Sequence, residues 1–469
     1  MIRISKRASK GARAALLAIG LMTGTATLST TVMAAPAAPK MNFTKPFAAV
    51  AGPLSKALED LKKAPTFIAA QGKVTAATSA LQQARGTAAI AQARSAREAA
   101  VAELRATMTA QISQLEGVFA AIGNQDDRLM AGQIATNLGS MALDPALQRR
   151  GVVAMIESGK VSPADLPKFQ YYAGSLAYDV KDYAAARAGL QAAVSAGYHD
   201  NDADALLAEA YLSDNQVPQG LAVLKQAIAQ RNSTPSKAPA GWYRRGLGAA
   251  YKANLLDQAT DFAISLVKAY PTSDNWSGAI TVVREIGKFP AQETLDLMRL
   301  MGRTNSYAEE RDYVEYIQAA DPRRLPGEVL KVIEAGVAAG KLRATDTFVS
   351  EARGIANMRI AADRASLVGL ERDARSPTAS AATVGGAADA FLSYGEAAKA
   401  ESLFNLAMAK PGAEQDRLLT RLGIAQLDQG NYAGSQATFA RVGGTRKYLA
   451  QLWSIYAGLK AAPAPVAAP

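Results

Sequence analysis

The sequence predicts an all-α protein, an α-solenoid of stacked helix pairs, and three observations lead to that fold class. Hydrophobic residues make up 49% of the 469 residues but aromatic residues only 6%, so the apolar content is mostly Ala, Leu and Val. Ala and Leu are among the strongest helix formers. Helix-length segments alternate with short polar turns from about residue 126 to 275, and the layout of 208–227 recurs at 423–442. Such recurrence is typical of a repeat protein.

The first 34 residues have the pattern of a secretory signal peptide. The stretch "MIRISKRASKGAR" is basic, an apolar run follows at 14–22, and Val32-Met33-Ala34 resembles a small-residue cleavage site. We therefore expect cleavage after Ala34 and a periplasmic or otherwise exported protein without a transmembrane span. A membrane anchor is the alternative, but the apolar run is shorter than the ~20 residues that a span needs.

Charge and cysteine content narrow the function classes. The formal net charge is +11, and the signal segment holds five of the cations and no acid, so the mature charge is 11 − 5 = +6. No dense stripe of Lys and Arg interleaved with aromatic residues occurs, so a nucleic-acid partner is not expected. The absence of cysteine excludes disulfides, thiol catalysis and zinc ribbons. It also suits a bacterial periplasm better than a eukaryotic secretory route.

Residues 35–125 form a predicted Ala-rich helical region. We expect one or two short helices over 42–63, broken near Gly52-Pro53, and then a long Ala-rich helical segment over 68–122. One apolar stripe follows this segment, with residues three, four or seven apart: Val101, Leu104, Met108, Leu115, Val118 and Ile122. Packing of this stripe against the following helices is the favoured role, and a coiled-coil seam is the alternative.

Five segments share one helix-pair layout, best seen at 416–444. There Leu422-Gly423 lies on the first helix, Gly430-Asn431-Tyr432 in the turn, and Ser435 and Phe439 on the second helix. The other four segments are 167–200, 201–232, 241–273 and 381–411. The layout resembles the tetratricopeptide repeat, TPR, whose 34-residue unit is two antiparallel helices that cross at small residues. Because a lone pair cannot bury its apolar surface, at least three units must stack.

The resemblance implies a domain organisation along the chain. We expect a first TPR-like array at 126–275 and C-terminal repeats at 381–460, covered by a capping helix from about 446 to 459. The intervening segment 276–380 is expected to form irregular helical hairpins that either continue the solenoid or divide two arrays. Residues 372–386 are the expected flexible joint, and residues 461–469 are a disordered Pro/Ala tail.

No pattern of catalytic or metal-binding residues stands out in the chain. His199 is the single histidine, so a histidine-ligated metal cluster is excluded. The run "HDNDAD" lacks the spacing of an EF-hand loop, and Asp202 or Asp204 is better explained as a helix N-cap. Neither a phosphate-binding loop nor a nucleophile elbow occurs, and Glu309–Asp312 is expected to be a solvated helix face where Arg311 pairs with Glu315. We therefore predict a protein that is not an enzyme and has no cofactor.

The resemblance also implies where a partner would bind. In the TPR family a concave groove is lined by the first helix of each unit, and Tyr, Trp and Arg are common binding hot spots. The equivalent residues are Lys168, Tyr171, Ser175 and Tyr178, then Asp202, Ala205, Glu209 and Leu212, then Trp242, Arg245, Ala249 and Lys252. Packing of the aromatic members against neighbouring helices is the alternative.

The expected function is a non-catalytic exported TPR scaffold or adaptor that mediates protein–protein interaction in the bacterial cell envelope. Its partner would be an unidentified envelope protein or peptide. Two alternatives stay open: an envelope enzyme, or accessory subunit of one, with its site in 276–380, and a structural protein that oligomerises through its N-terminal helix.

Overall fold

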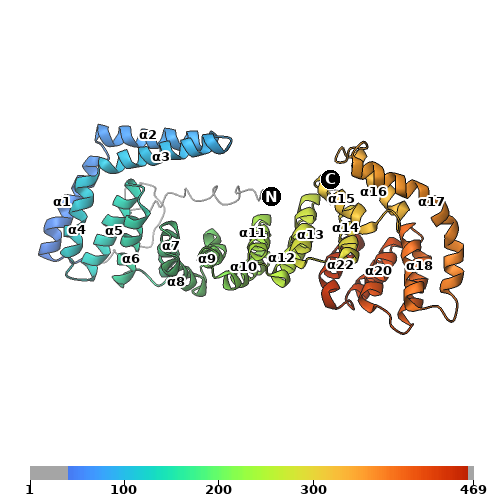
Figure 1. Ribbon diagram of the computed structural model, residues 1–469. Coiled ribbons are helices and arrows are strands. Elements are labelled where there is room, and N and C mark those ends of the chain that lie inside the picture. Colours follow the sequence, from blue (N-terminus) through green and yellow to red (C-terminus); the bar gives the residue numbers. More distant parts are fainter. Residues whose placement is uncertain (1–40, 463–469) are drawn as a thin grey trace, which may run out of the picture. The chain divides into compact units, whose positions relative to one another are not determined.

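The computed structural model describes residues 41–462, which form 22 α-helices and two short 3-10 helices joined by turns (Figure 1). The expected signal peptide lies outside the described residues, as does the tail from 463. The chain divides into two compact units, one ending at Ala227 and the other beginning at Ile228. This boundary falls inside α10 (Val217–Asn232), within the range that the sequence groups as one array.

Unit 1 holds the helices up to the first part of α10. Their bounds are α1 Lys45–Leu61, α2 Pro65–Gln83, α3 Thr87–Ala106, α4 Thr109–Ala120, α5 Gln125–Met141, α6 Pro145–Glu157, α7 Leu166–Asp179, α8 Tyr183–Ser195, η1 Asp200–Asp202 and α9 Ala203–Ser213. From α4 onward each helix packs on the next one in the chain, up to α9.

The helix break that the sequence predicts at Gly52-Pro53 is absent, and that prediction is wrong. Helix α1 runs unbroken through both residues, which are exposed, while Phe47, Leu54 and Leu58 on its opposite face are buried against α4 and α5. An internal proline costs a helix ~3 kcal/mol. Burial of one continuous apolar face offsets that cost here.

The Ala-rich segment 68–122 is three helices rather than one. Gly86 has a φ of +82°, which glycine adopts readily, and the chain reverses there so that α2 and α3 pack together as a hairpin (Figure 1). A second break at Thr107-Met108 separates α3 from α4. The predicted stripe is nevertheless buried over most of its length, including Leu104, Met108, Leu115 and Val118.

Small residues set the helix crossings in unit 1, as the repeat layout predicts. A Cβ built on Gly174 of α7 would lie 2.7 Å from the backbone nitrogen of Leu190 in α8. In the preceding pair a Cβ on Gly151 of α6 would lie 2.5 Å from the carbonyl oxygen of Gly132 in α5. Each crossing is therefore too close for a larger side chain.

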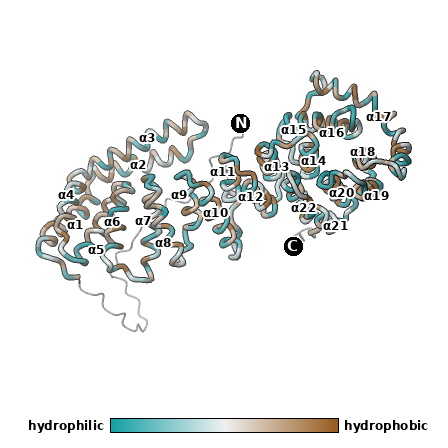
Figure 2. Tube along the Cα trace, turned by 60° about the horizontal axis from the view of Figure 1, so that its bottom comes forward, coloured by the Kyte–Doolittle hydropathy of each residue, from teal (hydrophilic) through white to brown (hydrophobic). Residues whose placement is uncertain are grey.

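Unit 2 holds the rest of α10, twelve further α-helices and one 3-10 helix. Their bounds are α11 Ala240–Lys252, α12 Leu256–Ala269, α13 Ser273–Gly287, α14 Ala291–Arg303, α15 Glu310–Ala320, α16 Pro326–Ala338, α17 Thr347–Ala374, α18 Ala381–Ser393, α19 Ala397–Met408, α20 Gln415–Asp428, α21 Tyr432–Phe439, η2 Gly444–Arg446 and α22 Lys447–Ala461. Hydrophobic and hydrophilic positions alternate along these helices (Figure 2).

The best repeat match in the sequence has the expected geometry. A Cβ on Gly423 of α20 would lie 2.6 Å from the Phe439 ring of α21, and the Ser435 hydroxyl donates to the Gly423 carbonyl at 2.7 Å. In the pair α11–α12, a Cβ on Gly246 would lie 2.3 Å from the Phe262 ring. The predicted all-α architecture of consecutive helix pairs is confirmed, and it is consistent with a TPR-like α-solenoid.

The segment 276–380 continues the stack through α13 to α17, each helix packing on the next. Pro290 and Pro326 stand at the starts of α14 and α16, where a missing N–H leaves no helix bond unmade. The expected joint at 372–386 is mostly helical, because α17 runs to Ala374 and α18 begins at Ala381 with Ser380 as its side-chain cap.

The last helix does more than cover the final repeat. Besides α21, helix α22 packs on α12 and α14 (Figure 1). Its Trp453 is fully buried, and the indole N–H donates to the backbone oxygen of Asp296 at 3.0 Å. The Tyr456 hydroxyl donates to the backbone oxygen of Arg303 at 2.9 Å. Helix α22 thus returns to earlier helices of unit 2 and closes it.

Candidate functional site

The residues expected to line a groove lie in both units, so each unit carries its own candidate surface. In unit 1, Lys168, Tyr171 and Tyr178 are on α7 and Glu209 is on α9. In unit 2, α11 carries the rest of the set, of which Trp242 and Arg245 are half-buried and Lys252 is exposed.

The two groove tyrosines of α7, Tyr171 and Tyr178, are partly engaged in packing. The Tyr171 ring centroid lies 5.2 Å from that of Tyr198, and the Tyr178 ring centroid lies 5.6 Å from that of Tyr183. The Tyr178 hydroxyl is 3.1 Å from the Ser213 hydroxyl at the end of α9. Both rings keep part of their surface exposed, so they combine a packing role with a surface that a partner could contact.

Other predicted groove positions are core residues. Leu212 of α9 is 8% exposed and Ala249 of α11 is 5% exposed. Sequence spacing places them on the same face as the tyrosines and Trp242, but their small or aliphatic side chains are covered by the neighbouring helices. Apart from the half-buried Ala205, the groove positions that stay at the surface are those with polar or aromatic side chains.

A buried charge cluster, which the sequence did not predict, lies in unit 2 around Asp296 of α14. Asp296 is fully buried and meets three guanidinium groups, from α14, α20 and η2. The Arg299 and Arg421 nitrogens lie 2.9 Å and 3.2 Å from Oδ1. The Arg446 Nη1 donates to Oδ2 at 2.7 Å.

Two further carboxylates, Glu328 and Asp389, pair with those arginines. Glu328 of α16 accepts two hydrogen bonds from Arg299, at 2.7 Å and 2.8 Å, and a third from the Tyr316 hydroxyl. Asp389 of α18 accepts from both Arg421 and Arg417 of α20 through its Oδ2. Four cations thus meet four carboxylates, namely Arg299, Arg417, Arg421 and Arg446 with Glu293, Asp296, Glu328 and Asp389.

The protonation states of the cluster follow from this geometry. Burial alone would raise the pKa of Asp296, but Arg421, Arg299 and Arg446 outweigh it and lower that pKa to about 2. Burial likewise opposes ionisation of Glu328, and Arg299 nevertheless lowers the pKa of this carboxyl. The two carboxylates are charged at neutral pH, and the cluster joins α14, α16, α18, α20 and η2 as fixed ion pairs.

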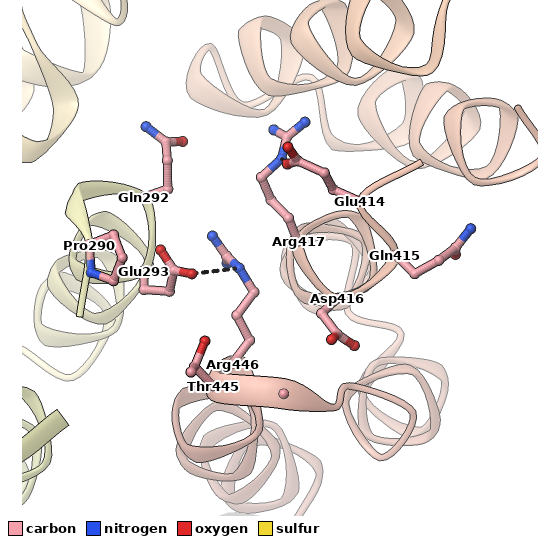
Figure 3. A pocket seen from close by; sticks show the side chains of 10 residues that line it. Pro290, Gln292, Glu293, Glu414, Gln415, Asp416, Arg417, Thr445 and Arg446 are labelled. Carbon is pink, nitrogen blue, oxygen red and sulfur yellow. Dashed lines mark hydrogen bonds and ion pairs between the residues drawn. The ribbon is translucent and has the colours of Figure 1, made fainter. Parts of the chain in front are cut away.

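An open pocket of about 460 Å³ lies beside the cluster, between α14, α20 and η2 (Figure 3). Its charged lining is mixed, with Arg417 and Arg446 facing Glu293, Glu414 and Asp416. Figure 3 shows Glu293 joined to Arg446, at an N–O distance of 3.5 Å. Arg417 also pairs with Asp389 and Arg446 with Asp296 in the buried cluster. The charged side chains of this pocket therefore join helices to one another.

The run at 309–312 is solvated as expected at Glu309, Glu310 and Arg311, which are exposed, but not at its last residue. Asp312 is buried and accepts hydrogen bonds from the backbone nitrogens of Ala308 and Glu309. Arg311 pairs with Glu285 at 3.6 Å, whereas Glu315 pairs with Arg284 of α13 at 3.1 Å. The predicted Arg311–Glu315 pair is wrong because α13 supplies closer partners to both residues.

His199 and its acidic neighbours form a local turn structure. The His199 Nδ1 lies 2.8 Å from Asp204 Oδ2. Asp202 occupies the N-cap position of α9 in a left-handed conformation, with no capping bond from its side chain. Among residues 41–462, no group of three or more His, Cys, Asp and Glu side chains could hold a metal ion. None of the helices in this range has the length and apolar character that a membrane crossing needs.

Comparison with known proteins adds a weak likeness to solved structures. No protein-family model matches the chain, and no curated protein sequence is similar to it. A solved structure described as "Structure of Naa15/Naa10 bound to HypK-THB" aligns over 86% of this chain and 70% of its own, at 13% identity and a TM-score of 0.20. A likeness with so low a TM-score supports no conclusion about function.

Proposed function

We propose that this protein is a non-catalytic scaffold that binds another protein through the surfaces of its helix pairs. The observation that supports the proposal is the arrangement of first helices α7 and α11. Both hold large aromatic side chains, Tyr171, Tyr178 and Trp242, that are neither fully buried nor fully exposed. Tyrosine, tryptophan and arginine at such positions contribute large contact areas at low entropic cost.

The proposal includes export to the bacterial envelope, on the strength of the first 34 residues. The mature chain should then begin at or next to Ala35. N-terminal sequencing of the native protein, together with cell fractionation, tests this part separately. A cytoplasmic protein that retains Met1 would refute it.

The binding proposal is tested with the purified protein as bait in an envelope extract, followed by mass spectrometry and titration of the captured partner. Trp242→Ala and Arg245→Ala should each weaken binding by roughly thirtyfold, as loss of a hot spot does. Lys331→Ala on the exposed face of α16 is the control and should bind normally. Melting temperatures should stay nearly unchanged.

Two results would count against these assignments. Failure to retain any partner would contradict the scaffold function. Normal partner binding by both α11 variants, or a loss explained by unfolding, would mean that α11 is not the binding surface. The C-terminal repeats at 381–460 would then be the next surface to test.

A further inference from the structure

A second open pocket lies in unit 1 and was not indicated by the sequence. Its volume is about 400 Å³, and it is bounded by α4, α5, α6 and the end of α7. The floor is apolar and includes Phe119, Val153, Ala154 and Val180. A pocket of this kind can seat one apolar side chain and remove it from water.

Three arginines surround that floor. Arg128 comes from α5, while Arg149 and Arg150 are adjacent on α6. The Arg150 guanidinium carbon lies 3.9 Å from the centroid of the Phe119 ring, so this cation covers one side of the aromatic floor. The only acidic side chain in the lining is Glu157, so the lining residues alone carry three positive charges and one negative charge.

Each arginine has an internal carboxylate partner that is easily displaced. Arg128 pairs with Glu157 at 2.9 Å, Arg149 with Asp182 at 2.9 Å, and Arg150 with Glu116 through two nitrogens. The side chains of Glu157, Asp182 and Glu116 are 54%, 42% and 67% exposed. Exposed pairs of this kind contribute little stability, so a partner's carboxylate can replace them at small cost.

We propose that this pocket binds an acidic segment of a protein partner. An apolar side chain of the segment sits on Phe119 and Val153, and flanking carboxylates pair with Arg128 and Arg149. The inference rests on the proposed scaffold function and deepens it by giving the chemistry of the partner. Charge complementarity selects this occupant, since a basic segment would meet three arginines.

The position of the pocket distinguishes it from the groove that the repeat resemblance implies. Six of its nine lining residues belong to α6, the second helix of its pair: Ala146, Arg149, Arg150, Val153, Ala154 and Glu157. The groove residues lie on first helices instead. The pocket in unit 2 differs as well, because its arginines hold buried carboxylates and its lining has more acids than bases.

Isothermal titration calorimetry with the purified protein tests the proposal. The probe is the capped peptide Asp-Glu-Leu-Phe-Glu-Asp, compared with Asn-Gln-Leu-Phe-Gln-Asn. We expect saturable binding of the acidic peptide only, weakened by added salt. The double variant Arg128→Gln/Arg149→Gln should weaken it by roughly tenfold, and Val153→Glu by at least as much.

Exposed Arg94 on α3 offers a matched control, and Arg94→Gln should leave peptide binding unchanged. Circular dichroism melting of each variant checks folding. No saturable binding of the acidic peptide up to about 1 mM, equal binding of the neutral peptide, or an equal loss in Arg94→Gln would overturn the proposal.

Two further outcomes separate this proposal from its rivals. Binding of phosphatidylglycerol vesicles in place of the peptide, lost in the double variant, would overturn it in favour of a lipid surface. A partner captured from envelope extract that binds the double variant normally would refute the pocket and leave the scaffold function standing.

Discussion

The two units use the same helix pairs in different ways. From α5 to α9, unit 1 is a succession of neighbours that cross at small residues, and its arginines pair with exposed carboxylates. In unit 2 the last helix returns to α12 and α14, and a buried charge cluster joins helices far apart in the chain. We infer that stacking of helix pairs alone gives an array in which each helix packs mainly on its neighbours in the chain. In unit 2, buried ion pairs between distant helices add a preference for one arrangement, in which the last helix packs on earlier ones.

The physical reason lies in the cost of burying charge. A carboxylate with no solvent exposure is tolerated only when cations and hydrogen bonds surround it, as at Asp296. Any arrangement of unit 2 that separates α14 from α20 or η2 leaves a buried charge without its partners. The cluster therefore penalises alternative packings more strongly than apolar contacts do.

The largest expected effect is that of Asp296→Asn. The variant removes the negative charge that pairs with Arg299, Arg421 and Arg446. Breaking a buried ion pair in this way lowers the unfolding free energy by about 3–5 kcal/mol. Urea unfolding followed by tryptophan fluorescence measures the effect in unit 2 alone, because all three tryptophans lie there: Trp242, Trp276 and Trp453.

Asp373→Asn is the matched control for that measurement. The Asp373 side chain is 60% exposed and pairs with Arg372 on the surface of α17, so its loss should cost about 1 kcal/mol or less. Equal effects of the two substitutions would mean that the Asp296 cluster does not hold unit 2 together.

The sequence predicts the part of this comparison that depends on local spacing. Gly174 and Gly423 occupy the predicted crossings, because two helices joined by a short turn must meet at small residues a fixed distance apart. The cluster could not be predicted in the same way. Asp296 meets Arg421 and Arg446 across 125 and 150 residues, and no local pattern marks which acid and base will meet.

The candidate surfaces were predictable to a smaller extent. Spacing identified α7 and α9 as first helices, but it could not tell the half-buried Tyr178 from the buried Leu212 at equivalent positions. The pocket around Phe119 was missed, since Arg149 and Arg150 look like an ordinary surface pair in the sequence. Only the packing of α4 against α5 brings an aromatic floor beneath them.

Lowering the pH should reduce the unfolding free energy of unit 2, because Asp296 becomes protonated. The pKa of Asp296 is lowered from 3.8 to about 2, so its ionisation contributes stability above pH 4 that is lost as pH falls towards 2. A shift of this size corresponds to about 2 kcal/mol. Urea titrations at neutral pH and near pH 2.5, followed by tryptophan fluorescence, should show this loss in the parent and less of it in Asp296→Asn. An equal loss in both would assign the acid sensitivity to other carboxylates.

A smaller effect is expected in unit 1 from Asp127→Asn. Burial raises the pKa of Asp127, but hydrogen bonds from the Thr44 hydroxyl and the backbone N–H groups of Gly123 and Thr44 outweigh it and lower the pKa. These bonds tie the start of α1 to α5, at 2.7 Å for the hydroxyl. Their weakening should cost about 1–2 kcal/mol and speed hydrogen exchange near residues 42–48 and 121–130.

The control for this variant is Asp165→Asn at the exposed start of α7. It should leave exchange near residues 42–48 unchanged. The urea transition seen by tryptophan fluorescence should be the same in both variants, since it follows unit 2. A shift of that transition in Asp127→Asn would show that the units do not unfold separately.

The most direct test of the difference between the units compares hydrogen exchange in Gly174→Leu and Gly423→Leu. Each substitution forces a large side chain into a helix crossing, and overpacking typically costs ~1–3 kcal/mol. For Gly174→Leu we predict faster exchange confined to α6 through α9, because α7 and α8 pack on each other and on α6 and α9. For Gly423→Leu we predict faster exchange in α18 through α22 and also in α12 and α14, which α22 contacts. Faster exchange limited to α18 through α22 would contradict the account, because α22 would then not couple the last repeats to the earlier helices of unit 2.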